Sequence, residues 1–144
     1  MRGTVISINI SHRKGQKKMP VKEAIVNEYG IVGDAHAGKW HRQISLLAEE
    51  SIEKMRTAEL RIGYGDFAEN ITTRDIDLSK LMVGQKLKIG KEVILEITQI
   101  GKKCHDECEI KRVVGKCVMP KEGIFARVIS GGKIKVGDEI TVLG

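Results

Sequence analysis

Apolar and polar positions alternate along several short segments of the chain, and a period of two residues is the spacing of a β-strand whose two faces have different surroundings. In "EVILEITQI" one face carries Val93, Leu95 and Ile97. This segment follows "KLKIGK", so the pair Gly90-Lys91 predicts the turn of a β-hairpin. Two further strands are predicted near the C-terminus, in "IFARVI" and "DEITVL".

The N-terminal segment "GTVISINI" alternates in the same way. Its clearly apolar face carries Thr4, Ile6, Ile8 and Ile10. The opposite face carries Val5, Ser7 and Asn9. The pattern predicts a strand with one apolar side.

Helical spacing is convincing in one segment, "LAEESIEKMRTAEL", which runs from Leu47 to Leu60. Its apolar positions are Leu47, Ile52, Met55 and Leu60. Three acidic residues come early in it, where they suit the positive end of a helix dipole: Glu49, Glu50 and Glu53. A shorter helix is predicted over residues 107–114.

Short strands separated by tight turns indicate a barrel. The chain has 16 glycines and only 2 prolines. The segments "VGQKLKIG" (83–90) and "VGDEITVLG" (136–144) both enter a strand through Val-Gly and a polar residue, which we interpret as a recurrent strand-entry turn. Many short strands with one or two helices predict a mainly β barrel, and the length of 144 residues fits one domain over residues 1–144.

Charge and composition narrow the class of partner. The formal net charge of +6 favours phosphates, anionic cofactors or nucleic acid. Aromatic residues make up only 3% of the chain, which argues against a nucleic-acid binder that stacks bases on aromatic rings. The basic segment "SHRKGQKKMP" (11–20) is interpreted as an exposed, mobile loop, and contacts of Lys14, Lys17 and Lys18 with phosphate or nucleic acid are the alternative.

No part of the sequence predicts membrane insertion or secretion. No stretch approaches the roughly 18 apolar residues that a transmembrane helix needs. The N-terminal "MRGTVISINIS" alternates like a strand and lacks the features of a signal peptide. We therefore expect a cytoplasmic protein, in which an odd count of three cysteines argues against structural disulfides.

All three cysteines lie in one segment, "GKKCHDECEIKRVVGKCVMPKEG". Together with His105 they supply four ligands, the number that a structural zinc site uses. Their spacing, Cys-x3-Cys-x8-Cys, differs from the usual zinc pairs, and the neighbours Cys104 and His105 would point to opposite faces of a strand. The surrounding lysines favour a thiolate, so a reactive thiol at Cys104, just after a predicted strand, fits better. Structural zinc and three passive thiols remain the alternatives.

Two other segments gather polar side chains. The glycine-rich "GIVGDAHAGKWHRQISLL" (30–47) is typical of an anion-receiving or proton-handling site. Its polar residues include Asp34, His36, Lys39, His41 and Arg42. The segment "GDFAENITTRDIDL" (65–78) offers amide and hydroxyl groups suited to phosphate or carbonyl recognition. These belong to Asn70, Thr72 and Thr73.

In this order, the segments resemble the MOSC domain, the module named for the C-terminal part of eukaryotic molybdenum cofactor sulfurases. The matching pieces are "GIVGDAHAGKWHRQISLL", "GDFAENITT", "LMVGQKLKIG", "LEITQIGKKCHDEC" and "GKCVMPKEGIFARVISGGKIKVGDEI". They span about Val5 to Val142, and the chain resembles the short, stand-alone bacterial form. The resemblance implies a β-rich, barrel-like fold, which agrees with the strand pattern.

The resemblance also implies a working cysteine after the "TQIG" strand, which here is Cys104. In the family this thiol is proposed to carry sulfur as a persulfide or to ligate molybdenum. A second thiol, Cys108 or Cys117, would then resolve the persulfide. Contacts to the anionic pterin of a molybdenum cofactor (molybdopterin) are expected from His36, His41, Arg42, Asn70, Thr72 and Lys102.

The resemblance covers only part of the larger family members. Sulfurases carry an aminotransferase-like domain with pyridoxal phosphate, so no pyridoxal phosphate site is expected in this chain. We therefore expect a sulfur carrier or molybdenum-cofactor-binding protein that acts with a partner. The partner would be a sulfur donor such as a cysteine desulfurase, or a molybdoenzyme acceptor. The alternative is a small structural-zinc or anion- and nucleic-acid-binding barrel without a catalytic role.

Overall fold

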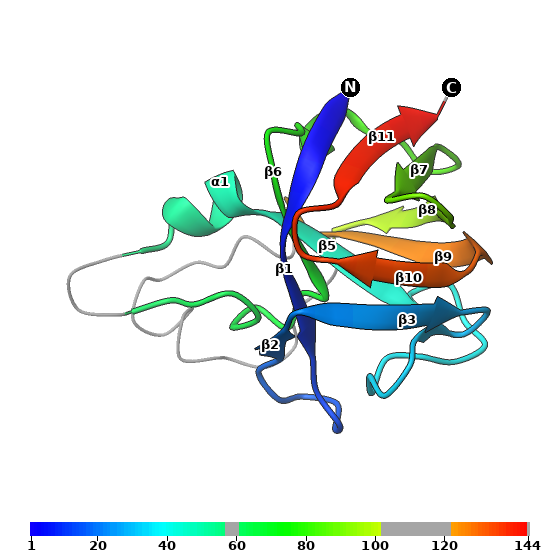
Figure 1. The fold of residues 1–144 in the computed structure, drawn as a ribbon. Coiled ribbons are helices and arrows are strands. Elements are labelled where there is room, and N and C mark those ends of the chain that lie inside the picture. Colours follow the sequence, from blue (N-terminus) through cyan, green and yellow to red (C-terminus); the bar gives the residue numbers. More distant parts are fainter. Residues whose placement is uncertain (57–60, 102–121, 144) are drawn as a thin grey trace.

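The computed structural model describes residues 1–56, 61–101 and 122–143, which form mostly strands (Figure 1). The strands are β1 (Arg2–Ile10), β2 (Met19–Val21), β3 (Glu23–Asn27), β4 (Gly30–Ile31), β5 (Ile44–Ala48), β6 (Ile71–Arg74), β7 (Lys86–Ile89), β8 (Val93–Ile100), β9 (Ile124–Ser130), β10 (Gly132–Lys135) and β11 (Glu139–Leu143). The helical elements are α1 (Glu49–Glu53) and the short 3-10 helix η1 (Leu78–Lys80). The predicted mainly β architecture is confirmed.

Seven of the described strands close into a barrel. They hydrogen-bond in the order β11-β7-β8-β9-β5-β6-β1, and β1 pairs back onto β11, with Arg2 opposite Thr141. Neighbours in this ring are antiparallel except β5 and β6, which are parallel. β2 lengthens the sheet beside β1, and β10, β3 and β4 make a separate small sheet. The chain ends lie close together in Figure 1 because β1 and β11 are paired.

The alternation correctly predicted which side of β8 faces the interior. Val93, Leu95 and Ile97 are fully buried, while the residues between them are partly exposed. These three side chains belong to one aliphatic cluster, to which β1, β5, β6, β7, β9 and β11 also contribute. The segments predicted as C-terminal strands form β9 and β11.

Two kinds of predicted turn are also present. The hairpin at Gly90-Lys91 joins β7 to β8, and Ile89 pairs with Val93 across it. The Val-Gly turns before β7 and β11 recur with the same backbone conformation, since Gly84 and Gly137 have φ angles of 95° and 98°. The two strands that follow these turns pair with each other in the barrel.

The apolar face predicted for β1 is correct at Ile8 and Ile10 but wrong at Thr4 and Ile6, because Val5 is the residue buried in that half of the strand. The register against β6 shifts between Val5 and Ser7, so Ile6 is an extra residue at a β-bulge. An extra residue exchanges the two faces of a strand, and Val5 and Ile8 therefore both enter the aliphatic cluster. The same shift places Ser7 and Asn9 in a buried polar environment on the other side.

The predicted helix over residues 47–60 is much shorter in the structure. Leu47 belongs to β5, where it pairs with Thr72 of β6, so sheet pairing prevails over helical spacing at this position. The helix α1 covers only Glu49–Glu53, with Glu49 and Glu50 in its first turn as predicted. The predicted helix at 107–114 lies outside the described residues. Within the described ranges, no helix has the length and apolar character needed to span a membrane.

We predict that Gly65→Ala lowers the free energy of unfolding by more than Gly15→Ala does, although both glycines have a similar positive φ angle. Gly65 has a φ of +88°, and a Cβ there would lie 2.1 Å from the Lys18 carbonyl oxygen. We expect a loss of about 3 kcal/mol in the free energy of unfolding, from left-handed backbone strain and overpacking together. Gly15→Ala is the matched control, because its φ is +80° but nothing lies within 4 Å. Urea unfolding measures both, and equal losses would contradict the clash.

Candidate functional site

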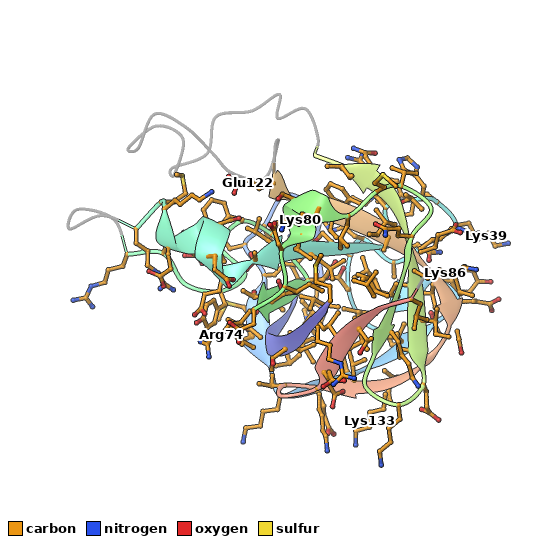
Figure 2. All side chains as sticks on the ribbon, turned by 90° about the horizontal axis from the view of Figure 1, so that it is seen from above. Lys39, Arg74, Lys80, Lys86, Glu122 and Lys133 are labelled. Carbon is orange, nitrogen blue, oxygen red and sulfur yellow. The ribbon has the colours of Figure 1, made fainter. Side chains whose placement is uncertain are left out.

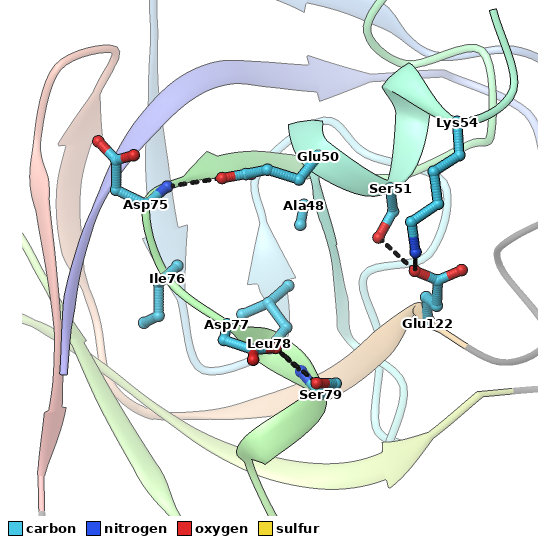
Figure 3. Close-up of a pocket in the computed structure, with 10 residues that line it drawn as sticks. All are labelled: Ala48, Glu50, Ser51, Lys54, Asp75, Ile76, Asp77, Leu78, Ser79 and Glu122. Atoms are coloured by element: carbon cyan, nitrogen blue, oxygen red, sulfur yellow. Dashed lines mark hydrogen bonds and ion pairs between the residues drawn. The ribbon is translucent and has the colours of Figure 1, made fainter.

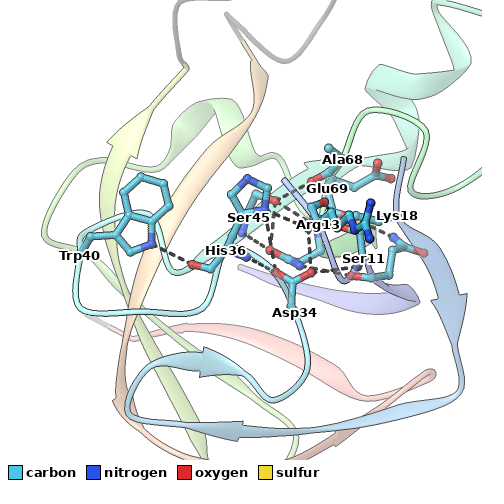
Figure 4. Close-up of polar contacts among 11 residues, drawn as sticks. Ser11, Arg13, Lys18, Asp34, His36, Trp40, Ser45, Ala68 and Glu69 are labelled. Carbon is cyan, nitrogen blue, oxygen red and sulfur yellow. Dashed lines mark hydrogen bonds and ion pairs between the residues drawn. The ribbon is translucent and has the colours of Figure 1, made fainter. Parts of the chain in front are cut away.

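A pocket of about 240 Å³ lies where several loops meet the strands β5 and β9. The residues that line it come from distant parts of the sequence: Lys14, His36, Trp40, Arg42, Ser45, Ala68, Asn70 and Phe125. Lys14 comes from the loop after β1, and His36, Trp40 and Arg42 come from the glycine-rich loop between β4 and β5. Part of this arrangement is visible in Figure 4.

Two cations at the pocket, Arg42 and Lys14, have no anionic partner within the described part of the chain. The Arg42 guanidinium carbon lies 4.7 Å from the ring centroid of Trp40 and 5.6 Å from that of Phe125. Its buried Nε atom has no hydrogen-bond partner among the described residues. The Lys14 ammonium lies 4.9 Å from the Trp40 ring centroid. Cation–π contacts hold both side chains in place, and these contacts bring no opposite charge to either cation.

Elsewhere among the described residues, the basic side chains do not gather on one face. Figure 2 shows Lys39, Arg74 and Lys133 projecting from different sides of the molecule. Arg74 forms an ion pair with Glu49 at 2.6 Å, and Lys133 forms one with Glu23 at 3.0 Å. The two cations at the pocket therefore differ from these surface cations in having no anionic partner among the described residues.

Behind the pocket, a buried ion pair joins the basic loop to the glycine-rich loop (Figure 4). The Lys18 Nζ atom lies 2.7 Å from Asp34 Oδ1, and both side chains are fully shielded from solvent. The expected exposure of residues 11–20 is correct for residues 12–17, 19 and 20 but wrong for Ser11 and Lys18, which are buried. A buried ammonium needs a compensating charge, and Asp34 supplies it.

Asp34 is the centre of this contact. Its Oδ1 accepts the backbone N–H of Ser11 at 3.1 Å, and its Oδ2 accepts the backbone N–H of His36 at 3.1 Å. Burial alone would raise the pKa of Asp34, but the Lys18 ammonium and the Ser11 N–H outweigh burial and hold that pKa below its ordinary value. Asp34 is therefore ionised at neutral pH and fixes both loops.

The floor of the pocket is a neutral hydrogen-bond network. Asn70 Oδ1 accepts the backbone N–H of Ser45 at 2.9 Å, and its Nδ2 donates to the backbone oxygen of Asn9 at 3.2 Å. The Asn9 amide donates to Thr72 Oγ1 at 3.1 Å. Asn70 thus lines the pocket, whereas the fully buried Thr72 lies one layer behind it.

Glu69, next in this network, is a second buried carboxyl group with the opposite character. Its Oε2 accepts the Thr72 hydroxyl at 2.7 Å and the Gly65 N–H at 3.1 Å. Its Oε1 is buried with no hydrogen-bond partner in the described part of the chain. Burial raises the pKa of Glu69, and the hydrogen bonds from Thr72 and Gly65 only partly counter this effect.

The structure brings together three of the residues predicted from the sequence: His36, Arg42 and Asn70. His41 is exposed and outside the lining, with its Nε2 atom 2.8 Å from Gln99 Oε1. The predicted residues Lys102, Cys104, Cys108 and Cys117 lie outside the described residues. The sequence reasoning missed Trp40, Ser45, Ala68 and Phe125. Trp40 could have been predicted, because it is the single tryptophan of the sequence and lies in a glycine-rich polar loop. Nothing in the sequence around Ser45, Ala68 or Phe125 indicates a place in the pocket.

Gly101 and Gly123, which lie on either side of residues 102–121 in the sequence, are paired beside this site. The backbone N–H of Gly101 donates to the carbonyl oxygen of Gly123 at 2.7 Å. The Gln99 side chain donates to the Gly101 carbonyl at 2.8 Å, and the same side chain contacts His41. Phe125, two residues after Gly123, lines the pocket.

A larger cavity of about 530 Å³ lies on another part of the barrel (Figure 3). Its polar groups largely satisfy one another: Glu50 accepts the Asp75 backbone N–H at 3.1 Å, and Lys54 donates to Glu122 at 2.8 Å. Across the residues that the structure describes, no three His, Cys, Asp or Glu side chains are grouped as a metal site requires.

Fold and site together define a small, closed β-barrel protein with a cation-lined pocket formed by loops and strand ends. The chain belongs to the MOSC domain family, whose model matches residues 33–141. A comparison with curated proteins found no match.

Solved structures show the same fold. The chain is similar to YuaD from Bacillus subtilis, with a TM-score of 0.81, 20% identity, and coverage of 99% of this chain and 96% of that one. It is also similar to YiiM from Escherichia coli, with a TM-score of 0.70, 20% identity, and coverage of 100% and 70%. A third similar structure is YiiM from Geobacillus stearothermophilus, with a TM-score of 0.72, 18% identity, and coverage of 99% of this chain and 75% of that one. These likenesses confirm the predicted MOSC-type barrel.

We predict that Glu69→Gln weakens the pH dependence of stability. The folded-state pKa of Glu69 is raised above 4.5, so the folded wild type binds more protons than the unfolded chain above that pH. The stability of the wild type therefore falls relative to that of the variant as the pH rises from 4.5 through the folded-state pKa. The total loss is about 1.4 kcal/mol for each pH unit by which the folded-state pKa exceeds the unfolded-state pKa. Urea unfolding at pH 4 and pH 7.5 should show similar stabilities at the lower pH and a more stable variant at the higher one. A variant that loses stability at both would contradict the assignment.

Proposed function

We propose that this MOSC protein binds an anionic, phosphate-bearing ligand of the molybdenum cofactor (molybdopterin) type in the pocket and carries sulfur on Cys104. The observation that supports ligand binding is a pair of cations, Arg42 and Lys14, that have no anionic partner among the described residues, at a pocket that His36 also lines. When bound, such a cofactor would supply the metal and dithiolene chemistry. The residues of this chain would bind and orient its anionic end.

The residue types fit a phosphate group. A guanidinium presents several N–H donors in a plane and binds phosphate through paired hydrogen bonds. A buried donor without a partner is costly, and Arg42 Nε has none among the described residues, so an oxyanion that reaches the guanidinium would relieve this cost. The volume of about 240 Å³ suits the anionic head of a ligand better than a whole drug-sized molecule.

The sulfur-carrying role is proposed from the cysteine segment. Cys104 follows Gly101 by three residues, which limits the distance between their Cα atoms to about 11 Å. Gly101 is tied to Gly123 and Gln99, both near the pocket, so this short reach supports a thiol close to the ligand site. The lysines on either side of Cys104 in the sequence favour its thiolate.

The proposed sulfur transfer is a thiol exchange. The Cys104 thiolate attacks the outer sulfur of a persulfide on a donor such as a cysteine desulfurase, a new S–S bond forms, and the donor leaves as a thiolate. A thiolate at Cys108 or Cys117 could attack the Cys104 sulfur, expel hydrosulfide and leave a disulfide. Alternatively, a thiolate of a molybdoenzyme acceptor would attack the outer sulfur, form a new S–S bond and release Cys104 as a thiolate.

The first test measures anion binding through the fluorescence of Trp40, which is the only tryptophan and lines the pocket. Inorganic pyrophosphate should change the fluorescence of the wild type. Arg42→Gln should weaken binding by tenfold or more, since a hydrogen bond to a charged group contributes about 1.5–3 kcal/mol. Arg127→Gln is the matched control, because that exposed arginine pairs with Glu96 at 2.7 Å. Equal affinities in the two variants would refute the pocket as the anion site.

The second test follows sulfur. The protein is incubated with a low-molecular-weight persulfide, and intact mass spectrometry should show added sulfur in the wild type that is lost on reduction. Cys104→Ser should abolish the adduct, whereas Cys108→Ser and Cys117→Ser should retain it. Unchanged sulfur loading in Cys104→Ser would rule out this thiol as the carrier. Metal analysis of the same protein tests the zinc alternative, which predicts about one zinc per chain.

A further inference from the structure

The buried ammonium of Lys18 has a complete set of partners. Its Nζ atom lies 2.7 Å from Asp34 Oδ1, 3.1 Å from Ser11 Oγ and 2.9 Å from His36 Nδ1. An ammonium has three N–H donors and no acceptor. The Ser11 hydroxyl donates its own hydrogen to the Arg13 carbonyl at 3.1 Å, so it accepts from Lys18. Each Lys18 donor therefore has one partner.

We propose that the Lys18–Asp34 pair fixes His36 as its Nε2–H tautomer, so that this ring contributes a hydrogen-bond donor to the pocket. Because Lys18 can only donate, the Nδ1 atom of His36 must accept and cannot carry a proton. In a neutral imidazole the proton then lies on Nε2. The tautomer rests on contacts among described residues, whereas its effect on ligand binding rests on the proposed anion-binding function.

The surroundings of His36 oppose a second ring proton. A proton on Nδ1 would face the ammonium of Lys18 at 2.9 Å, so two cationic donors would point at each other. Asp34 Oδ2 is 3.9 Å from Nδ1 and already accepts the His36 backbone N–H. The other charged side chains that line the described part of the pocket, Arg42 and Lys14, are also cationic.

The orientation of the His36 ring is set from the other side by Trp40. The two rings are nearly parallel, with an interplanar angle of 10° and centroids 6.3 Å apart. The Trp40 Nε1–H donates to the His36 carbonyl oxygen at 2.8 Å, which fixes the loop between them. Lys18 is therefore a positioning residue, since it is too deeply buried to contact a ligand itself.

The chemical consequence is a pocket in which Arg42, Lys14 and His36 all donate. This set of hydrogen-bond donors recognises a ligand group that only accepts hydrogen bonds. A fully ionised phosphate is such a group. A ligand that offers N–H or O–H groups would give the donors of Arg42 and Lys14 no acceptor, at a cost. The tautomer of His36 thus selects for oxyanions over neutral groups of similar size.

The test observes the ring directly. Protein labelled with ¹⁵N-histidine is examined by NMR at neutral pH through two-bond ¹H–¹⁵N correlations, and His36→Gln assigns the His36 signals. The expected pattern has an unprotonated Nδ1 and a protonated Nε2. An Nδ1–H tautomer or a doubly protonated ring in the wild type would overturn the proposal without requiring any folding-sensitive variant.

A double variant tests whether Lys18 and Asp34 cause the tautomer. Lys18→Met with Asp34→Asn removes both buried charges together, which avoids leaving one unpaired. We expect His36 to lose its single tautomer and pyrophosphate affinity to fall on the order of tenfold. Lys22→Met is the matched control, because Lys22 is exposed and outside the network. A folded double variant that keeps the wild-type tautomer would refute the positioning role.

The outcomes separate this inference from the proposed function. An Nε2–H tautomer in a wild type that binds no pyrophosphate would refute anion binding and confirm the tautomer. Pyrophosphate binding with an Nδ1–H tautomer would refute the inference and leave the anion site intact. A merely structural Lys18 would lower stability in the double variant without changing the His36 signals.

Discussion

The buried ion pair between Lys18 and Asp34 is the constraint on which the rest of the site depends. An ammonium inside a protein is tolerated only where an opposite charge and enough acceptors surround it, and here Asp34, Ser11 and His36 provide all of them. The pair ties the end of β1 to the glycine-rich loop. It therefore lets residues 12–17 remain exposed while both ends of their loop are anchored, which places Lys14 at the pocket.

The two buried carboxyl groups at the site, those of Asp34 and Glu69, have opposite roles. Asp34 contacts a cation and stays ionised, whereas Glu69 has only neutral donors and its pKa is raised by burial. The charge of Asp34 is compensated by the ammonium of Lys18, and the raised pKa of Glu69 favours its neutral form. Neither carboxyl group forms an ion pair with Arg42 or Lys14, so the described lining of the pocket keeps its positive character despite acidic residues close behind it.

The sequence predicts the fold class and part of the site, and the failures have physical causes. Alternation identifies the interior face of β8, but it cannot reveal the bulge at Ile6, because the extra residue is defined only by pairing with β6. Burial of Lys18 is equally hidden, since a run of basic residues looks solvated and its partner Asp34 lies 16 positions away. His36, Arg42 and Asn70 could be predicted from polar, glycine-rich segments. Phe125 could not, because only the β5–β9 pairing brings it to the pocket.

The loop that carries Arg42 is ordered before any ligand arrives. Gln43 is buried and donates to the carbonyl oxygens of Glu28 and Gly38 at 3.0 and 2.8 Å, while its Oε1 accepts the Val128 N–H of β9 at 2.8 Å. The side-chain amide of Gln43 therefore fixes the end of the loop, next to β5, against β9 of the barrel. Arg42, the next residue back, is then held between two aromatic rings. A ligand that reaches the guanidinium meets a side chain already fixed in position, so little of its binding free energy is lost in ordering the loop. Affinity for an anion at this pocket therefore depends on the hydrogen bonds of Gln43 as much as on the charge.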